Sequence, residues 1–236
     1  VNYLKTVEPG IDIEKGKKEL KEFKSKNVNK PVQEISSFKE LSATETLNSG
    51  ITLASTLPTN LSVSRVYQRT SGVVSPNSAC GPAVGVMIAN YYRNVRLFSN
   101  IRNSAYYGGT AKHINHMYYM MNSYFFGTNQ YSFHNGLQTE ANIGGGQYVA
   151  KSRAYGTSSE PSIANIQNAI NKKYPLALLE SLNYSNGLRY HWTVIAAYNS
   201  NGQVGYYDPD GSNASMKWVS WTSIMGKRSY TYLALD

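Results

Sequence analysis

The stretch that decides the fold lies at residues 77–92 and reads NSACGPAVGVMIANYY. Its apolar residues recur at spacings of three and four, which predicts a helix over residues 80–92. Pro82 fixes the start of this helix, because proline lacks an N–H group and is tolerated only in the first turn, where that donor has no partner within the helix. The N-cap residue is therefore expected within about one residue of Cys80.

Cys80 is the only cysteine in the chain, which excludes a disulfide within the chain and a zinc site built from several thiolates. At a helix start, a thiol meets the positive end of the helix dipole and unpaired backbone N–H groups. These groups favour the thiolate and can also bind an oxyanion. The alternative that this position leaves open is a small buried side chain with no chemical role.

Downstream of this helix the chain predicts helices first and strands afterwards, which is typical of an α+β fold. Helices are expected over residues 111–123 and 161–173, the second capped by Ser159 with Pro161 in its first turn. Short β-rich runs, separated by Asn, Ser, Gly and Pro, follow at residues 175–182, 191–198, 203–208, 216–219 and 229–235.

A shift in composition divides the chain near residues 56–59. The part before it is rich in Lys and Glu and holds only one of the twenty tyrosines. We expect residues 1–57 to form an extension, with polar helices over residues 13–27 and 38–47, that serves as a brace, a stalk or an inhibitory prosegment. Residues 58–236 are expected to form the globular domain.

The net charge of +9 is unevenly distributed along the chain. Residues 61–236 hold fourteen Lys and Arg against six Asp and Glu, so nucleic acid, anionic lipid and an anionic cell-wall polymer are the partners to consider for this surface. No Lys/Arg-rich run or nucleic-acid-binding motif is present, so nucleic acid is not expected, whereas the wall polymer is kept as a candidate. No run of about 18 apolar residues occurs, so we expect no membrane span.

His191 opens one of the expected strands, and Asp208 closes the next. Residues 199–202 between these strands carry a turn signal, which predicts a hairpin. With an even-numbered loop the two side chains fall on the same face of the sheet, and a turn centred between Asn199 and Ser200 would set them directly opposite. A carboxylate in that place orients an imidazole and stabilises its protonated form.

These residues together resemble a known family. The run at residues 77–83, the strand-initial His191 and the Asp-Pro pair that begins at Asp208 look like those of the C39-like cysteine peptidases, papain-like proteins related to the peptidase domains of bacteriocin-processing transporters. The resemblance implies that residues 58–236 are a C39-like peptidase domain. It also implies a papain-like α+β fold, in which an N-terminal helical part with Cys80 at a helix start packs on a C-terminal antiparallel sheet that carries the histidine and the aspartate.

The resemblance also implies a function for each matching residue. Cys80 matches the nucleophile of the family, His191 the base and Asp208 the orienting acid. Gln68, twelve residues upstream of the cysteine, matches the glutamine that donates to the oxyanion, and Asn77 is the next candidate for that role. The implied reaction is hydrolysis of a peptide or related amide bond through a thioester, without a metal or cofactor.

Two other functions are compatible with the same residues. A catalytically idle module could keep the papain-like shape and bind a wall polymer or peptide at the cell surface, and an acyltransferase would pass the thioester to an amine. The composition, with Lys-rich flanks, many Tyr, Ser and Asn residues and no disulfide, resembles that of proteins exported by Gram-positive bacteria. We therefore expect a secreted or cell-surface location, any export signal having been removed before Val1.

His113 and His116 stand three residues apart, on one face of an expected helix, and this spacing can bind a metal. No third ligand lies nearby in the sequence. We therefore expect no metal site here, and a groove-lining or surface role for the two histidines.

Overall fold

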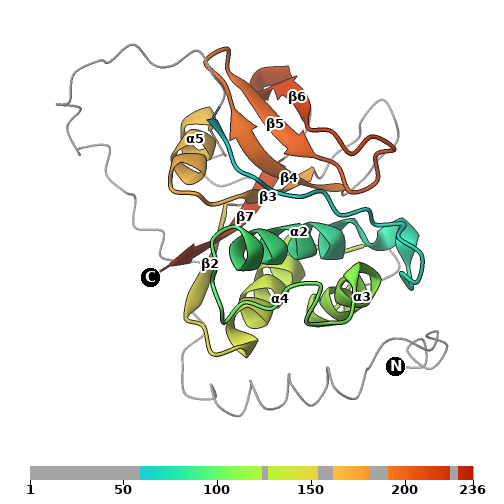
Figure 1. Ribbon diagram of the computed structural model, residues 1–236. Helices are drawn as coiled ribbons and strands as arrows, with labels where there is room; N and C mark the ends of the chain where they lie inside the picture. The colour runs from blue at the N-terminus through green and yellow to red at the C-terminus, as the bar shows by residue number, and fades with distance from the viewer. Residues whose placement is uncertain (1–58, 124–126, 154–161, 181–190, 224–227, 236) are drawn as a thin grey trace.

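The computed structural model describes residues 59–123, 127–153, 162–180, 191–223 and 228–235 (Figure 1). The extension expected at residues 1–57, including its two helices, lies outside the described residues. No helix in the described part combines the length and the apolar character needed to cross a membrane.

Helices and strands occur in the order expected of an α+β fold, which confirms the predicted class (Figure 1). The helices are α2 (Cys80–Asn94), α3 (Thr110–Met120), α4 (Gln130–Ile143) and α5 (Ile163–Asn171), with short 3-10 turns η2 (Pro76–Ser78) and η3 (Trp221–Ser223). The strands are β1 (Thr59–Asn60), β2 (Tyr148–Arg153), β3 (Leu176–Glu180), β4 (His191–Tyr198), β5 (Gln203–Tyr207), β6 (Lys217–Ser220) and β7 (Arg228–Leu235).

All the strands in the described residues join one antiparallel sheet. Its order is β2-β7-β3-β4-β5-β6, and the short β1 pairs with β4 away from this path. Figure 1 shows α2, α3 and α4 together in one half of the molecule, and β4, β5 and β6 in the other. Helix α2 packs on β4, so the two halves meet where the helix that carries Cys80 faces the strand that begins at His191.

Helix α2 is central because it is covered on all sides. Its residues 80–89 are all buried, as expected of a helix without a polar face. Beside its first turn, Trp192 is fully buried, stacks on Phe133 with 4.0 Å between ring centroids, and donates its indole N–H to the carbonyl of Thr128 at 2.7 Å. The aromatic stacking and the satisfied N–H give this tryptophan one position in the core.

Gly81 allows the start of α2 to approach this tryptophan closely. A Cβ atom at Gly81 would lie 2.7 Å from the Thr128 hydroxyl and 3.2 Å from the Trp192 ring. Such distances leave no room for a side chain, so glycine is required here for packing. Because Gly81 follows Cys80 and Trp192 follows His191 in the chain, this contact brings the cysteine and the histidine together.

Helix α4 was not expected from the sequence. Two of its buried positions hold Gly136 and Glu140, which remove two apolar residues from the pattern that indicates a helix. Gly136 faces the backbone of Met121, where a Cβ would come within 2.7 Å of the Met121 Cα atom. The helix begins at an Asn129 cap, whose side chain accepts from the backbone N–H of Ser132.

Two further sequence predictions differ from the structure. The strand β2 was missed, because one of its inward positions is Ser152, a polar residue whose hydroxyl is satisfied by Thr231 at 2.7 Å. The expected cap of α5 at Ser159 is wrong. Ser162 caps this helix instead, and a capping box with Asn165 satisfies the backbone N–H groups of both residues.

The two histidines of α3 belong to a buried cluster, so the expected groove-lining or surface role is wrong. Glu140 of α4, which is 1% exposed, accepts from the Tyr107 hydroxyl at 2.5 Å and contacts His116 Nε2 at 2.8 Å. His113 is fully buried, with its Nε2 3.9 Å from the same carboxylate. The Tyr107 ring stacks on both imidazoles. The missing partner comes from a distant helix, which sequence spacing could not reveal.

Burial sets the protonation of this cluster. It lowers the pKa of His113 to about 4, so this histidine is neutral at pH 7. Burial alone would raise the pKa of Glu140, but the hydrogen bond and charge of His116 and the hydrogen bond from Tyr107 lower it below its usual value. A buried carboxylate therefore joins α3, α4 and the loop that holds Tyr107.

Replacing this carboxylate tests its structural role. Glu140→Leu leaves Tyr107 and His116 without their acceptor in the core, and we expect it to lower the free energy of unfolding by about 3–5 kcal/mol. Tyr131→Ala, on the same helix and 62% exposed in the parent, is the control and should change it by less than about 0.5 kcal/mol. Urea unfolding measures both; equal stability of Glu140→Leu and the parent would contradict the role.

Candidate active site

Cys80 is the first residue of helix α2. Ala79 is the N-cap residue, as expected to within one residue, and Pro82 follows inside the first turn. Ala79 has no polar side-chain atom and provides no side-chain cap to the N–H groups of the first turn. Cys80 is 6% exposed and lies at the end of the helix where backbone donors and the dipole favour negative charge.

The hairpin that brings His191 and Asp208 together differs from the predicted one. Asn199 N–H donates to the carbonyl of Gln203, so the turn encloses three residues and is centred on Asn201, one and a half residues later than expected. An odd loop alone would place the aspartate on the wrong face of the sheet. A one-residue shift in register between Ile195 and Ala197 corrects this, because a bulge adds one residue to β4.

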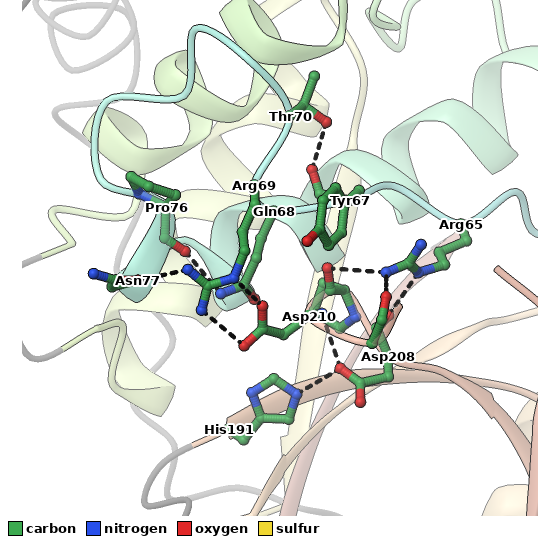
Figure 2. A network of polar contacts seen from close by, with 12 residues as sticks. Arg65, Tyr67, Gln68, Arg69, Thr70, Pro76, Asn77, His191, Asp208 and Asp210 are labelled. Carbon is green, nitrogen blue, oxygen red and sulfur yellow. Dashed lines mark hydrogen bonds and ion pairs between the residues drawn. The ribbon is translucent and has the colours of Figure 1, made fainter. Parts of the chain in front are cut away.

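Beyond the bulge the two side chains lie on the same face, but they are not directly opposite. Val194 pairs with Tyr207, so continuing the register would place Asp208 across from Thr193, two residues from His191. The side chains meet along this diagonal: His191 Nε2 lies 2.8 Å from Asp208 Oδ1 (Figure 2).

Both carboxylate oxygens of Asp208 are bonded. Oδ1 accepts from His191 and, at 2.9 Å, from the backbone N–H of Asp210, while Oδ2 accepts from Lys217 Nζ at 3.0 Å. The Arg65 guanidinium donates to the backbone carbonyl of Asp208 at 2.8 Å (Figure 2). These contacts hold the carboxylate in one orientation toward the imidazole.

The same contacts determine the charges at the site. Burial lowers the pKa of His191, but its hydrogen bonds with Asp208 and Cys80 outweigh burial and raise the pKa to about 10. Burial raises the pKa of Asp208, yet the hydrogen bond and the charge of His191 hold it well below its usual value. At neutral pH the site therefore holds an aspartate and an imidazolium. Because Nε2 binds the aspartate, Nδ1 is the ring nitrogen left for Cys80.

Gln68 lies in the loop that precedes η2 and is 2% exposed. Its Nε2 donates to the carbonyl of Pro76 at 2.8 Å, and its backbone N–H donates to the carbonyl of Pro209 at 2.9 Å. The side chain is thus fixed against the turn that leads into Cys80 (Figure 2). One N–H of the amide is taken by Pro76, and the second makes no hydrogen bond to the described residues.

Asn77, the second candidate oxyanion donor, is exposed and engaged elsewhere. Its side-chain oxygen accepts from Arg69, whose guanidinium also binds the Asp210 carboxylate with an Nη2–Oδ2 distance of 3.1 Å (Figure 2). Arg69 therefore links the turn before α2 to the loop that follows β5. Its role, and that of Arg65, were missed from the sequence, because nothing in the spacing distinguishes them among fourteen basic residues.

The chain belongs to the Peptidase_C39 like family, whose family model matches residues 60–234. The family predicted from the sequence is thereby confirmed, and at the level of the family the chain is a cysteine peptidase. A helical part with Cys80 at a helix start, packed on an antiparallel sheet that carries His191 and Asp208, is the arrangement that the resemblance predicted for a papain-like fold.

No curated protein matches the chain. Among solved structures, the chain is similar to the Pseudomonas avirulence protein AvrPphB, with 10% sequence identity and a TM-score of 0.33, over 67% of this chain and 93% of that one.

The charge state of His191 can be measured directly. NMR titration of the ring nitrogens should show His191 protonated well above pH 7, and Asp208→Asn should lower its pKa because the counter-charge is lost. Because the pKa of His191 is higher in the folded than in the unfolded protein, protonated His191 contributes to the free energy of unfolding. This contribution is complete below about pH 6.5 and is lost as the pH rises toward 10. Titration of His191 near pH 6.5 in the parent protein would contradict this assignment.

Proposed function

We propose that this protein hydrolyses a peptide or related amide bond, with Cys80 as the nucleophile, His191 as the acid and base, and Asp208 as the group that orients the imidazole. The observation that carries the proposal is the hydrogen bond of 2.8 Å between His191 Nε2 and Asp208 Oδ1, which leaves the other ring nitrogen of this histidine for Cys80. Membership of a cysteine peptidase family supports it independently.

The proposed reaction begins with the Cys80 thiolate, which is stabilised by the neighbouring imidazolium and by the start of α2. The sulfur attacks the carbonyl carbon of the substrate, and the carbonyl oxygen becomes an oxyanion. As the C–N bond breaks, His191 gives its proton to the leaving amine. Neutral His191 then takes a proton from water, which attacks the thioester; the carboxylic acid product leaves and loses its proton to solvent, and the thiolate–imidazolium pair is regenerated.

Gln68 is proposed as the side-chain donor to the oxyanion, together with a backbone N–H of the first turn of α2. Two features support this role: the amide is buried and held by Pro76 immediately before the helix, and one of its N–H bonds has no acceptor among the described residues. A donor that is already in position before the substrate binds stabilises the transition state without reorganisation.

The substrate class that we propose is a peptide or protein, and the location is outside the cell or at its surface. The location rests on composition alone, as does an anionic wall polymer as a second partner. For residues 1–57 we keep the roles of brace, stalk or prosegment. Transfer of the acyl group to an amine uses the same residues, and the products distinguish it from hydrolysis.

The proposal is tested by incubating the protein with a peptide library and identifying new termini by mass spectrometry. We expect cleavage by the parent and none by Cys80→Ala. Gln68→Ala should reduce kcat on the order of a hundredfold with little change in KM, whereas Asn77→Ala should retain most of the activity. New amide bonds in place of new carboxylates would indicate an acyltransferase. Cleavage that persists in Cys80→Ala would overturn the proposed peptidase activity, and so would a parent protein that binds peptides without cleaving them.

A further inference from the structure

The second oxygen of the Asp208 carboxylate has a partner that the proposed mechanism does not use. Lys217, the first residue of β6, places its Nζ atom 3.0 Å from Asp208 Oδ2. In the sheet Lys217 pairs with Tyr206 of the neighbouring strand, and this fixes the backbone from which the lysine reaches the carboxylate. Apart from His191, no other side chain in the described part of the chain is seen to donate to this carboxylate.

The loop after Asp208 leaves room for the ammonium group. A Cβ atom at Gly211 would lie 3.0 Å from Lys217 Nζ and 3.5 Å from Asp208 Oδ2, so a side chain there would crowd the contact. The Arg65 guanidinium holds this loop from the other direction through the carbonyls of Asp208, Pro209 and Gly211. The lysine and the carboxylate are therefore brought together by the sheet and by the loop.

The contact with Lys217 is important because the two oxygens of the Asp208 carboxylate have different donors. Oδ1 accepts hydrogen bonds from His191 and from the backbone N–H of Asp210, and Oδ2 accepts one from Lys217. A donor on each oxygen sets the plane of the carboxylate as well as its position, whereas donors on Oδ1 alone leave rotation about the Cβ–Cγ bond less restricted. The orientation of the imidazole toward Cys80 depends on that plane.

We propose that Lys217 is a positioning residue of this site, which holds the Asp208 carboxylate so that its other oxygen directs the His191 ring toward Cys80. The inference rests on the proposed function. Lys217 also brings a positive charge near the imidazolium. The other ionisable groups around this site are Arg65, which binds the Asp208 carbonyl, Asp210, which is bound by Arg69, Glu180, which pairs with His191 in the sheet, and the half-buried Tyr206. Removing the lysine charge therefore leaves His191 facing a carboxylate that no other side-chain cation contacts in the described part of the chain.

Lys217→Met removes the charge and keeps much of the side-chain length. We expect kcat to fall about three- to tenfold with KM unchanged; the effect is moderate because the Lys217 side chain is 39% exposed and solvent screens its charge. Lys217→Arg retains a donor and a charge and should recover most of the rate. Lys172→Met, an exposed lysine at the end of α5, is the matched control and should behave as the parent does.

A titration of the His191 ring separates this role from a structural one and needs no substrate. In Lys217→Met the His191 pKa should fall below that of the parent, because a carboxylate that is no longer held in one plane makes a weaker hydrogen bond to the imidazolium; a rise would show that the lysine acts only as a repelling charge and would overturn the proposal. An unchanged titration and an unchanged rate would overturn the proposal, as would a loss of rate that Lys217→Arg does not recover. If the parent cleaves no peptide while the titration shifts as expected, the proposed function fails and the contact between lysine and carboxylate is upheld.

Discussion

The site depends on one packing contact, that between the start of α2 and the buried Trp192. The indole lies 3.2 Å from where a Cβ of Gly81 would be, and it is itself fixed by Phe133 and by the carbonyl of Thr128. Each side of this contact is one residue away from a chemical group, Cys80 on the helix and His191 on the strand. The distance between sulfur and imidazole is thus set by the hydrophobic core, which is rigid because it is closely packed.

The core places Cys80 and His191, and hydrogen bonds of the loop after β5 place Asp208 beside them. The bulge in β4 puts Asp208 on the same face as His191, and its carboxylate then has donors on both oxygens. Arg65 and Arg69 attach this loop to the segment that precedes α2. The charges alternate from lysine to carboxylate to imidazolium, so that each group stabilises the ionised state of the next.

The sequence indicated the chemical residues because they are rare or have fixed positions. One cysteine stands at a helix start defined by Pro82, and few carboxylates follow His191. It did not indicate features that depend on contacts between distant elements. The turn between β4 and β5 was predicted with an even loop, since a bulge leaves no mark in the alternating pattern. Helix α4 was missed because Glu140 occupies a buried position that only its partners on α3 explain. Lys217 was one basic residue among many.

The central claim is that the pair of His191 and Asp208 activates Cys80, and the rate of alkylation of this cysteine by iodoacetamide tests it most directly. The account predicts rapid alkylation of the parent at pH 6, and a rate at least about tenfold lower in His191→Ala, because the imidazolium that stabilises the thiolate is gone. Asp208→Asn should lie between the two. Equal rates in the parent and His191→Ala, with both proteins folded, would contradict the account.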